Sequence, residues 1–454
     1  MPWHVSTVLK RMNKKVALHT LGCKLNFSET AAIGKQFTTR GFSVVEFSDH
    51  ADVYVLNTCS VTDNAEKECR QVIRRALRRN PEAFILVTGC YAQLRPEEIA
   101  RIDGVDAVLG SNEKFDLFSY LSDFNKKELA CIYTSSKDEL DHSFGVASST
   151  DIDSRTRAYF KIQDGCDYKC TYCTIPLARG GSRSLEPEKV IEQFRSIVNQ
   201  GYKEIILTGV NVGDYGKSFE IDFYCLLKKL VSVEGDFRIR ISSIEPNLLT
   251  DEIIALTLST EKLCKHFHIP LQSGSDKILR LMQRRYNAKD YKSLITKLHK
   301  ADPEIGIGVD VITGFPGETG EEFIETYNFL RDLPVSYLHV FNYSERPDTK
   351  AITFLGKVGG AERKHRSALL RILSDKKRFA FQEKFIGKKE RVLFEEADDN
   401  GVIKGFTSNY IRIFHPFRRE LQNQFSEVSI EKVLGNYCNA SLEGENFSVE
   451  RLAV

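Results

Sequence analysis

The stretch that decides the fold is Gly165-Cys-Asp-Tyr-Lys-Cys-Thr-Tyr-Cys173, which places Cys166, Cys170 and Cys173 on one short loop. We refer to these three as the barrel cysteines, because the strands and helices around them are predicted below to form a barrel. Three thiolates at this spacing can bind three irons of a [4Fe-4S] cluster and leave the fourth iron open to an exchangeable ligand. Zinc is the main alternative, but a structural zinc site normally takes a fourth ligand from a second cysteine or histidine pair, and none follows Cys173. The spacing therefore favours an iron–sulfur site.

The residues around this loop predict a barrel of alternating strands and helices. A strand-like run at 158–163 leads into the loop, and a helical pattern at 187–200 begins with a proline and stops at Gly201. Further apolar runs follow at 204–207, 237–241, 266–269, 308–312 and 337–342. About six β/α units indicate a partial (β/α)6 barrel, whose functional residues lie at the C-terminal ends of its strands.

A second set of cysteines occupies equivalent positions near the N-terminus. Buried strands are predicted at 16–20, 53–57 and 84–88 with helical patterns between them, which indicates a parallel sheet. The cysteines that follow these strands, hereafter the N-terminal cysteines, are Cys23, Cys59 and Cys90. Because the C-terminal ends of parallel strands share one edge of a sheet, these cysteines are expected to converge. A lone cysteine is commonly just a small buried apolar residue, but three at equivalent strand ends predict a shared cluster.

The pattern of apolar runs and the composition along the chain predict an α/β fold with three regions. Residues 14–125 form the N-terminal parallel α/β domain, and residues 155–375 form the barrel. Residues 126–154 are rich in Lys, Asp, Ser and Thr and are predicted to be a linker. Residues 376–445 contain short strands separated by turns, which predicts a small antiparallel β-barrel. A barrel of this kind either binds RNA or serves as a structural cap.

The overall composition of the 454-residue chain is that of an ordinary globular protein. The formal net charge of +2 neither demands nor excludes a nucleic-acid partner. No apolar run is long enough to cross a bilayer and no secretory signal is recognisable, so we expect a cytoplasmic protein without a membrane partner. An odd number of cysteines, 11, argues against a secreted disulfide scaffold. Those outside the two sets are predicted to be core or surface thiols: Cys69, Cys131, Cys225, Cys264 and Cys438.

The motifs taken together resemble a known family. The barrel-cysteine loop, with Tyr172 before its last cysteine, is similar to the signature of radical S-adenosylmethionine (SAM) enzymes. Thr20-Leu-Gly-Cys-Lys-Leu-Asn26 and Gly89-Cys-Tyr-Ala-Gln93 resemble the N-terminal domain of the methylthiotransferase family, and the C-terminal region looks like its TRAM domain. Together with Ile175-Pro-Leu-Ala-Arg-Gly-Gly-Ser-Arg-Ser184, these motifs look most like the MtaB branch, which modifies threonylcarbamoyladenosine beside the tRNA anticodon. The resemblance extends over nearly the whole chain in the family's domain order.

This resemblance implies a tRNA methylthiotransferase that uses SAM and two [4Fe-4S] clusters. In such an enzyme the barrel cysteines hold the cluster that binds SAM, and a 5′-deoxyadenosyl radical removes hydrogen from carbon 2 of the adenine. The N-terminal cysteines hold a second cluster with an exchangeable sulfur, which SAM methylates and which then joins that carbon. The implied partners are the tRNA anticodon loop, an electron donor such as flavodoxin or ferredoxin, and a sulfur source.

Further ligand contacts are proposed by their position in this family's barrel. The proposed SAM contacts are Tyr172, Gly209, Glu245, Gln272 and Asp310, which lie in the cysteine loop or at the predicted strands. Each of them is alternatively an ordinary loop residue or turn cap. Arg183, soon after the loop, is predicted either to meet a phosphate or carboxylate or to form a surface salt bridge.

RNA contacts are proposed where aromatic and basic residues interleave in the C-terminal region. Aromatic rings stack on unpaired bases while arginines hold phosphates. The proposed RNA-binding residues are Tyr410, Arg412, Phe414, Arg418 and Arg419. A second basic stripe, between Lys67 and Arg79, can also track a phosphate backbone, although it is more simply a solvated helix face.

Three functions remain open from the sequence. The leading one is a methylthiotransferase acting on threonylcarbamoyladenosine in tRNA. The second is the same chemistry on isopentenyladenosine in tRNA or on a ribosomal protein. The third is a zinc-stabilised RNA-binding protein without catalysis, against which the missing fourth ligand at each cysteine set argues.

Overall fold

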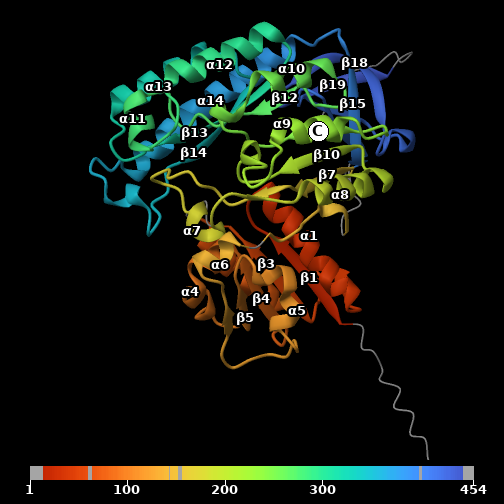
Figure 1. The fold of residues 1–454 in the computed structure, drawn as a ribbon, viewed down its shortest axis with the longest axis vertical. Coiled ribbons are helices and arrows are strands. Elements are labelled where there is room, and N and C mark those ends of the chain that lie inside the picture. The colour runs from red at the N-terminus through yellow and green to blue at the C-terminus, as the bar shows by residue number, and fades with distance from the viewer. Residues whose placement is uncertain (1–13, 60–63, 143, 152–155, 398–400, 443–454) are drawn as a thin grey trace, which may run out of the picture. The chain divides into compact units, whose positions relative to one another are not determined.

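The computed structural model describes residues 14–59, 64–142, 144–151, 156–397 and 401–442 (Figure 1). The chain divides into two compact units, Met1–Ile152 and Asp153–Val454. Among the described residues, no helix combines the length and the apolar character that a membrane span requires.

The first unit is a parallel sheet with helices on both faces, in the strand order β2-β1-β3-β4-β5-β6. Strands β3 and β4 are buried along their whole length, as their unbroken apolar sequences predict. Its strands are β1 (Lys15–Thr20), β2 (Ser43–Val45), β3 (Val53–Thr58), β4 (Phe84–Gly89), β5 (Ala107–Leu109) and β6 (Cys131–Tyr133). Its helices are α1 (Lys24–Thr39), α2 (Asn64–Arg79), α3 (Cys90–Leu94), α4 (Pro96–Ala100), α5 (Leu117–Tyr120) and α6 (Lys137–Asp141).

The stretch at 126–154, which the sequence predicts to be a linker, contains regular structure. Strand β6 pairs in parallel with β5, with Cys131 opposite Ala107. Ser136 caps helix α6 in a reciprocal arrangement with Glu139. Strand β6 is a three-residue edge strand that is only partly buried, and its short apolar run is surrounded by polar sequence, so the composition of the stretch as a whole is that of a linker.

The second unit begins with six parallel strands in two three-stranded sheets, β7-β10-β11 and β12-β13-β14. Isolated bridges such as Ser243–His268 join the two sheets, so the strands form a continuous but open barrel. This confirms the predicted partial barrel. The barrel strands are β7 (Arg157–Lys161), β10 (Glu204–Thr208), β11 (Arg238–Ile241), β12 (His266–His268), β13 (Gly306–Thr313) and β14 (Tyr337–Asn342).

Helices alternate with these strands, and a small hairpin carries the barrel cysteines. The hairpin strands are β8 (Gln163–Asp164) and β9 (Arg183–Ser184), and α7 (Ile175–Arg179) lies between them in the chain. The other helices are α8 (Pro187–Asn199), α9 (Phe223–Val231), α10 (Asp251–Ser259), α11 (Asp276–Leu281), α12 (Ala288–Ala301), α13 (Gly320–Asp332) and α14 (Gly360–Glu383). Short 3₁₀ helices are η1 (Glu113–Asp116), η2 (Ser149–Asp151), η3 (Val212–Asp214), η4 (Pro246–Leu248), η5 (Lys350–Thr353) and η6 (Arg419–Leu421).

The C-terminal strands close into a barrel in the order β15-β16-β17-β19-β18, which confirms the predicted small β-barrel. Its strands are β15 (Lys389–Ala397), β16 (Val402–Thr407), β17 (Arg412–Pro416), β18 (Phe425–Leu434) and β19 (Tyr437–Leu442). The barrel is mixed rather than antiparallel, because β17 and β19 pair in parallel. Closure explains the difference: strand direction cannot alternate all the way around a closed ring with an odd number of strands, so one neighbouring pair must be parallel.

A buried charge network joins the C-terminal barrel to the end of the larger barrel at which its parallel strands begin. Glu204, at the start of β10, accepts hydrogen bonds from Arg238 (2.6 Å) and Arg240 (2.9 Å). The same arginines donate to backbone carbonyl groups at the end of β16 and at the first residue after it. Burial by itself raises the pKa of the Glu204 carboxyl, but the positive charges of Arg240 and Arg238 hold that pKa well below its ordinary value. The two barrels are therefore connected through an ionised carboxylate that lies out of water.

Candidate active site

The barrel cysteines lie on a loop whose path depends on Gly165. This glycine has φ +70°, and a Cβ atom placed on it would lie 1.9 Å from the carbonyl oxygen of Gly181. Only glycine accepts both the left-handed backbone and the close approach. The loop is anchored at both ends, because the Cys166 amide donates to Gly180 O (3.1 Å) and the Thr171 amide donates to Met282 O (3.1 Å).

A buried aspartate supports the base of this loop. Asp164 accepts hydrogen bonds from Lys161 (2.8 Å), from Arg179 (3.0 Å) and from the Gly165 amide (2.9 Å). Burial alone raises the pKa of the Asp164 carboxyl, but the surrounding cations keep that pKa well below its ordinary value. Arg183 lies 3.7 Å from the same carboxylate and is largely buried, so it meets a protein carboxylate rather than forming a surface salt bridge.

The three barrel thiols lie close enough to influence one another's ionisation. Burial, together with a smaller contribution from negative charge on Cys170, raises the pKa of Cys166 and of Cys173 to about 12. Each of the three cysteine residues is partly exposed to solvent. Arg284 donates to the Cys170 sulfur (3.1 Å) and also pairs with Glu245. Three convergent thiols on one loop fit a cluster held by three cysteines, and iron binding would displace their protons.

We predict that Gly165→Ala removes the cluster site and leaves the remainder of the chain folded. The new methyl group would collide with the Gly181 carbonyl and push the cysteine loop away from its anchors. Iron content after anaerobic reconstitution is expected to fall by about four atoms per chain.

A matched control for this variant is Gly201→Ala. Gly201 also has a positive φ, +88°, but no atom lies within 4 Å of the position of its Cβ. It therefore carries the backbone penalty without the collision, and its iron content should match wild type. Iron content and SAM cleavage equal to those of wild type in Gly165→Ala as well as in Gly201→Ala would show that the loop does not need Gly165.

Gly209, a proposed SAM contact, has a structural reason to be glycine. A Cβ atom there would lie 2.7 Å from Gln163 Oε1. Gln163 donates to Gly165 O (2.8 Å) and accepts from the Asn211 amide (2.9 Å), so it ties the cysteine loop to the loop after β10. Within the described residues, Thr208 Oγ1 and Asn211 Nδ2 are buried at this strand end without a hydrogen-bond partner, which fits a polar ligand bound beside Gly209.

The other proposed SAM contacts differ in their surroundings. Glu245 is next to the cysteine loop through Arg284, and Gln272 joins Asp310 and Ile312 through its backbone, in a left-handed conformation. Tyr172 packs edge-on to Phe315, with ring centres 6.3 Å apart, among apolar side chains. Asp310 lies within β13, and its carboxylate accepts a hydrogen bond from His268.

The structure places the N-terminal cysteines directly after three adjacent parallel strands. Cys23 precedes α1, Cys59 follows β3, and Cys90 begins α3 after β4. Gly22 packs against Cys59 so closely that a Cβ atom on this glycine would lie 2.8 Å from the Cys59 sulfur. Asn26 fixes the same approach by donating to Thr58 O (3.1 Å). The three strand ends therefore meet at one edge of the sheet, with Cys23 exposed and the other two sulfurs buried.

The proposed RNA-binding residues separate into two groups. Tyr410 lies at the junction of the two barrels, with its ring centre 4.8 Å from the Arg240 guanidinium and 4.8 Å from the His266 ring. Arg412 is exposed on β17, and Phe414 on the same strand face stacks on Tyr437 at 4.0 Å. The remaining members of this group, Arg418 and Arg419, are exposed after β17.

Known proteins share the motifs of both units. The profile of the Radical SAM superfamily matches residues 160–330, which contain the barrel cysteines, and that of Uncharacterized protein family UPF0004 matches residues 15–110, which contain the N-terminal cysteines. The threonylcarbamoyladenosine tRNA methylthiotransferase MtaB of Bacillus subtilis is 41% identical, over 92% of this chain and 94% of that protein. This chain belongs to the radical SAM methylthiotransferase family.

Other methylthiotransferase relatives are more distant. The tRNA-2-methylthio-N(6)-dimethylallyladenosine synthase of Endomicrobium trichonymphae is 33% identical, over 91% of this chain and 96% of that protein. Among solved structures, the radical SAM methyltransferase TsrM from Kitasatospora setae, with cobalamin and a [4Fe-4S] cluster bound, aligns with a TM-score of 0.55 and 15% identity, over 75% of this chain and 77% of that one. At this identity the likeness extends to the fold alone. Both cysteine sets of this methylthiotransferase thus lie in regions that the family profiles match.

Proposed function

We propose that this chain is a threonylcarbamoyladenosine tRNA methylthiotransferase, which adds a methylthio group to carbon 2 of the adenine. The observation that carries the proposal is the 41% identity, across nearly the full length of both chains, to a relative of that name. The relative named for dimethylallyladenosine is less similar, at 33%. The N-terminal cysteines at parallel strand ends and the barrel cysteines on one loop support the chemistry, and the exposed part of the C-terminal barrel supports an RNA substrate.

The residues divide the work in this proposal. The barrel cysteines hold the [4Fe-4S] cluster that binds SAM, and the N-terminal cysteines hold a second one. When bound, these groups supply radical cleavage of SAM and a sulfur for transfer. Asp164 and Gly165 hold the cysteine loop in place, and Arg284 donates a hydrogen bond to Cys170. The proposed SAM contacts near the loop are Tyr172, Gly209, Glu245 and Gln272.

The substrate and accessory partners follow from the same proposal. Arg412, Phe414, Arg418 and Arg419 are the proposed contacts to the tRNA anticodon region, whereas Tyr410 serves to dock the C-terminal barrel. The Phe414–Tyr437 stack offers an aromatic surface for an unpaired base beside the exposed arginines. An electron donor such as flavodoxin or ferredoxin, a sulfur source and a cytoplasmic location complete the proposal.

Mass analysis of tRNA nucleosides from a deletion strain tests this function. The expected result is loss of the methylthio group from threonylcarbamoyladenosine, with methylthiolated isopentenyladenosine unchanged and the wild-type gene restoring the product. Loss of the methylthio group from isopentenyladenosine alone would refute the substrate. Purified protein that contains zinc and no iron after anaerobic reconstitution would refute the enzyme itself.

A further inference from the structure

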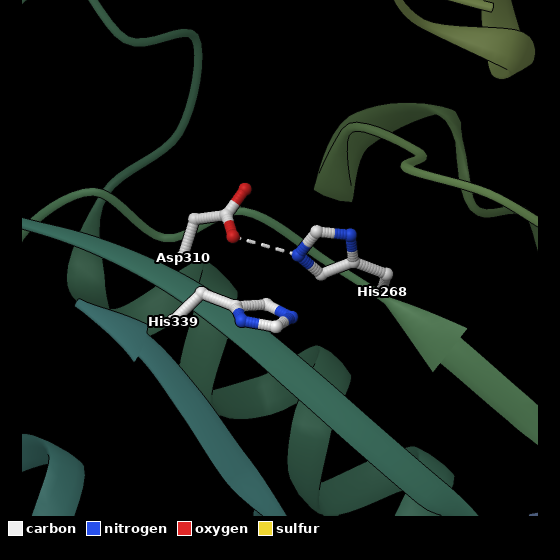
Figure 2. Close-up of side chains that lie close together, drawn as sticks. All are labelled: His268, Asp310 and His339. Atoms are coloured by element: carbon white, nitrogen blue, oxygen red, sulfur yellow. Dashed lines mark hydrogen bonds and ion pairs between the residues drawn. The ribbon is translucent and has the colours of Figure 1, made fainter. Parts of the chain in front are cut away.

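Three polar side chains converge on neighbouring strands of the larger barrel. His268, Asp310 and His339 come from the neighbouring strands β12, β13 and β14, and one nitrogen or oxygen atom from each lies within 4.8 Å of the others. Figure 2 shows the two imidazole rings and the carboxylate turned towards one another. We refer to these residues as the histidine cluster.

The histidine cluster lies deeper in the barrel than the cysteines. Asp310 and His339 each stand three residues before the end of their strands, which corresponds to roughly 10 Å along the strand. Strand pairing sets Asp310 directly opposite His339, so both face the same side of the sheet. The barrel cysteines, by contrast, follow the C-terminal end of the hairpin strand β8. A substrate whose reacting carbon is held near the cysteines can therefore extend towards this wall.

Two of the three members hold each other in a fixed arrangement. His268 Nδ1 is hydrogen-bonded to Ser243 Oγ (2.9 Å), and His268 Nε2 to Asp310 Oδ1 (2.7 Å). Burial raises the pKa of Asp310, but His268 and His339 outweigh this and lower it, so the carboxylate is ionised. The His339 ring crosses that of His268 at 73° with centres 5.1 Å apart, and His339 remains exposed.

Two imidazoles and a carboxylate are also a set of metal ligands. Here, however, both nitrogens of His268 already have partners in Ser243 and Asp310. A metal ion held by all three residues would have to break the His268–Asp310 hydrogen bond. An organic ligand that contacts the His339 ring and the second carboxylate oxygen of Asp310 would leave it intact. The arrangement is therefore better suited to an organic ligand that has both an anionic group and a hydrogen-bond donor.

We propose that the histidine cluster is the subsite for the carboxylate-bearing amino-acid substituent on N6 of the substrate adenine. This inference rests on the proposed function, because threonylcarbamoyladenosine has a carboxylate and a hydroxyl in that substituent. His339 donates to the substituent's carboxylate, and Asp310 accepts from its hydroxyl, while His268 holds Asp310 in position. Asp310 is thereby a substrate contact instead of the SAM contact that the sequence predicts.

The same cluster would discriminate against an apolar substituent. An isopentenyl group placed here would lie against the Asp310 carboxylate and the His339 ring and could not form a hydrogen bond to either. Sites built to hydrogen-bond a substrate group reject analogues that lack it by roughly 10⁴-fold. The cluster thus gives a physical reason for a preference between the two modified adenosines.

The test measures kcat/KM with anticodon stem–loop RNAs that carry either threonylcarbamoyladenosine or its methyl ester. It compares wild type, His339→Leu and His339→Gln, with His365→Leu as the control, because His365 is exposed on α14. In wild type the ester is expected to be roughly 10- to 100-fold poorer than the acid. With the acid RNA, kcat/KM of His339→Leu should fall by a similar factor relative to wild type. With the ester RNA, it should be close to that of wild type, because the ester and the substitution remove the same contact. His339→Gln, which keeps a donor, should recover part of the activity.

The outcomes separate the inference from the function on which it rests. Two results would overturn the subsite assignment and leave the function intact. One is that kcat/KM of His339→Leu on the ester RNA falls by the product of the two separate losses. The other is that wild type is equally active on both RNAs. Failure of wild type to modify the acid RNA, although it cleaves SAM, would refute the proposed function and this inference together. A circular dichroism spectrum and an iron content equal to those of wild type would show that His339→Leu is folded.

Discussion

Replacing Cys23, Cys59 and Cys90 together by alanine abolishes methylthio transfer and leaves the cleavage of SAM to 5′-deoxyadenosine in place. The physical reason is the division of the chain. The N-terminal cysteines end the strands of the first unit, whereas the barrel cysteines and their supports belong entirely to the second. Methylthiolated nucleoside is expected to fall below detection by mass spectrometry, while 5′-deoxyadenosine is still formed in the same reaction.

A cysteine of the same unit provides the control for this variant. Cys131 lies on β6, at the edge of the same sheet, and is partly exposed. Cys131→Ala should transfer the methylthio group at the wild-type rate. Methylthio transfer that persists in the triple variant would show that the N-terminal cysteines do not supply the sulfur.

Glu204→Gln is expected to lower the stability of the second unit by about 3 to 5 kcal/mol, the usual effect of removing one partner from a buried ion pair. The amide leaves Arg238 and Arg240 buried without a counter-charge, at the point where they also hold the C-terminal barrel. Chemical denaturation followed by circular dichroism measures the change. Asp332→Asn, which removes an exposed pair with Arg331, should leave stability close to that of wild type.

The Glu204 variant also changes the response to acid. The folded-state pKa of Glu204 lies below its ordinary value, so the stability it contributes is present above the ordinary value and is lost as pH falls through the folded pKa. The difference in stability between wild type and Glu204→Gln should therefore be largest near neutral pH and shrink in acid. A difference that is constant across this range would mean that Glu204 is not ionised in the folded chain.

Particular elements show how far the sequence predicts this fold. Strands β3 and β4 were recognisable because strands buried on both faces are apolar throughout. Strand β6 was not, because an edge strand of three residues carries no comparable pattern. The parallel pair β17–β19 was also out of reach, because it follows from closure of the ring of strands and not from any local sequence.

The candidate site divides in the same way. The positions of the six cysteines proposed to hold clusters were predictable, because each set has a regular spacing or a regular place after a strand. Asp164, Arg284, His268 and His339 were missed, because their partners come from distant elements and have no common spacing. The one local signal was an acidic residue immediately before the glycine of the cysteine loop. Tyr410 was proposed as an RNA contact because aromatic and basic residues alternate in the same way at a docking interface and on an RNA-binding surface.

The central claim is that the chain holds two independent [4Fe-4S] clusters, each on its own set of three cysteines. The most direct measurement is iron and acid-labile sulfide after anaerobic reconstitution of wild type, of the barrel-cysteine triple alanine variant and of the N-terminal triple alanine variant. About eight irons in wild type, falling to about four in each variant, is the predicted result. About four irons in wild type, unchanged when the N-terminal cysteines are lost, would contradict it.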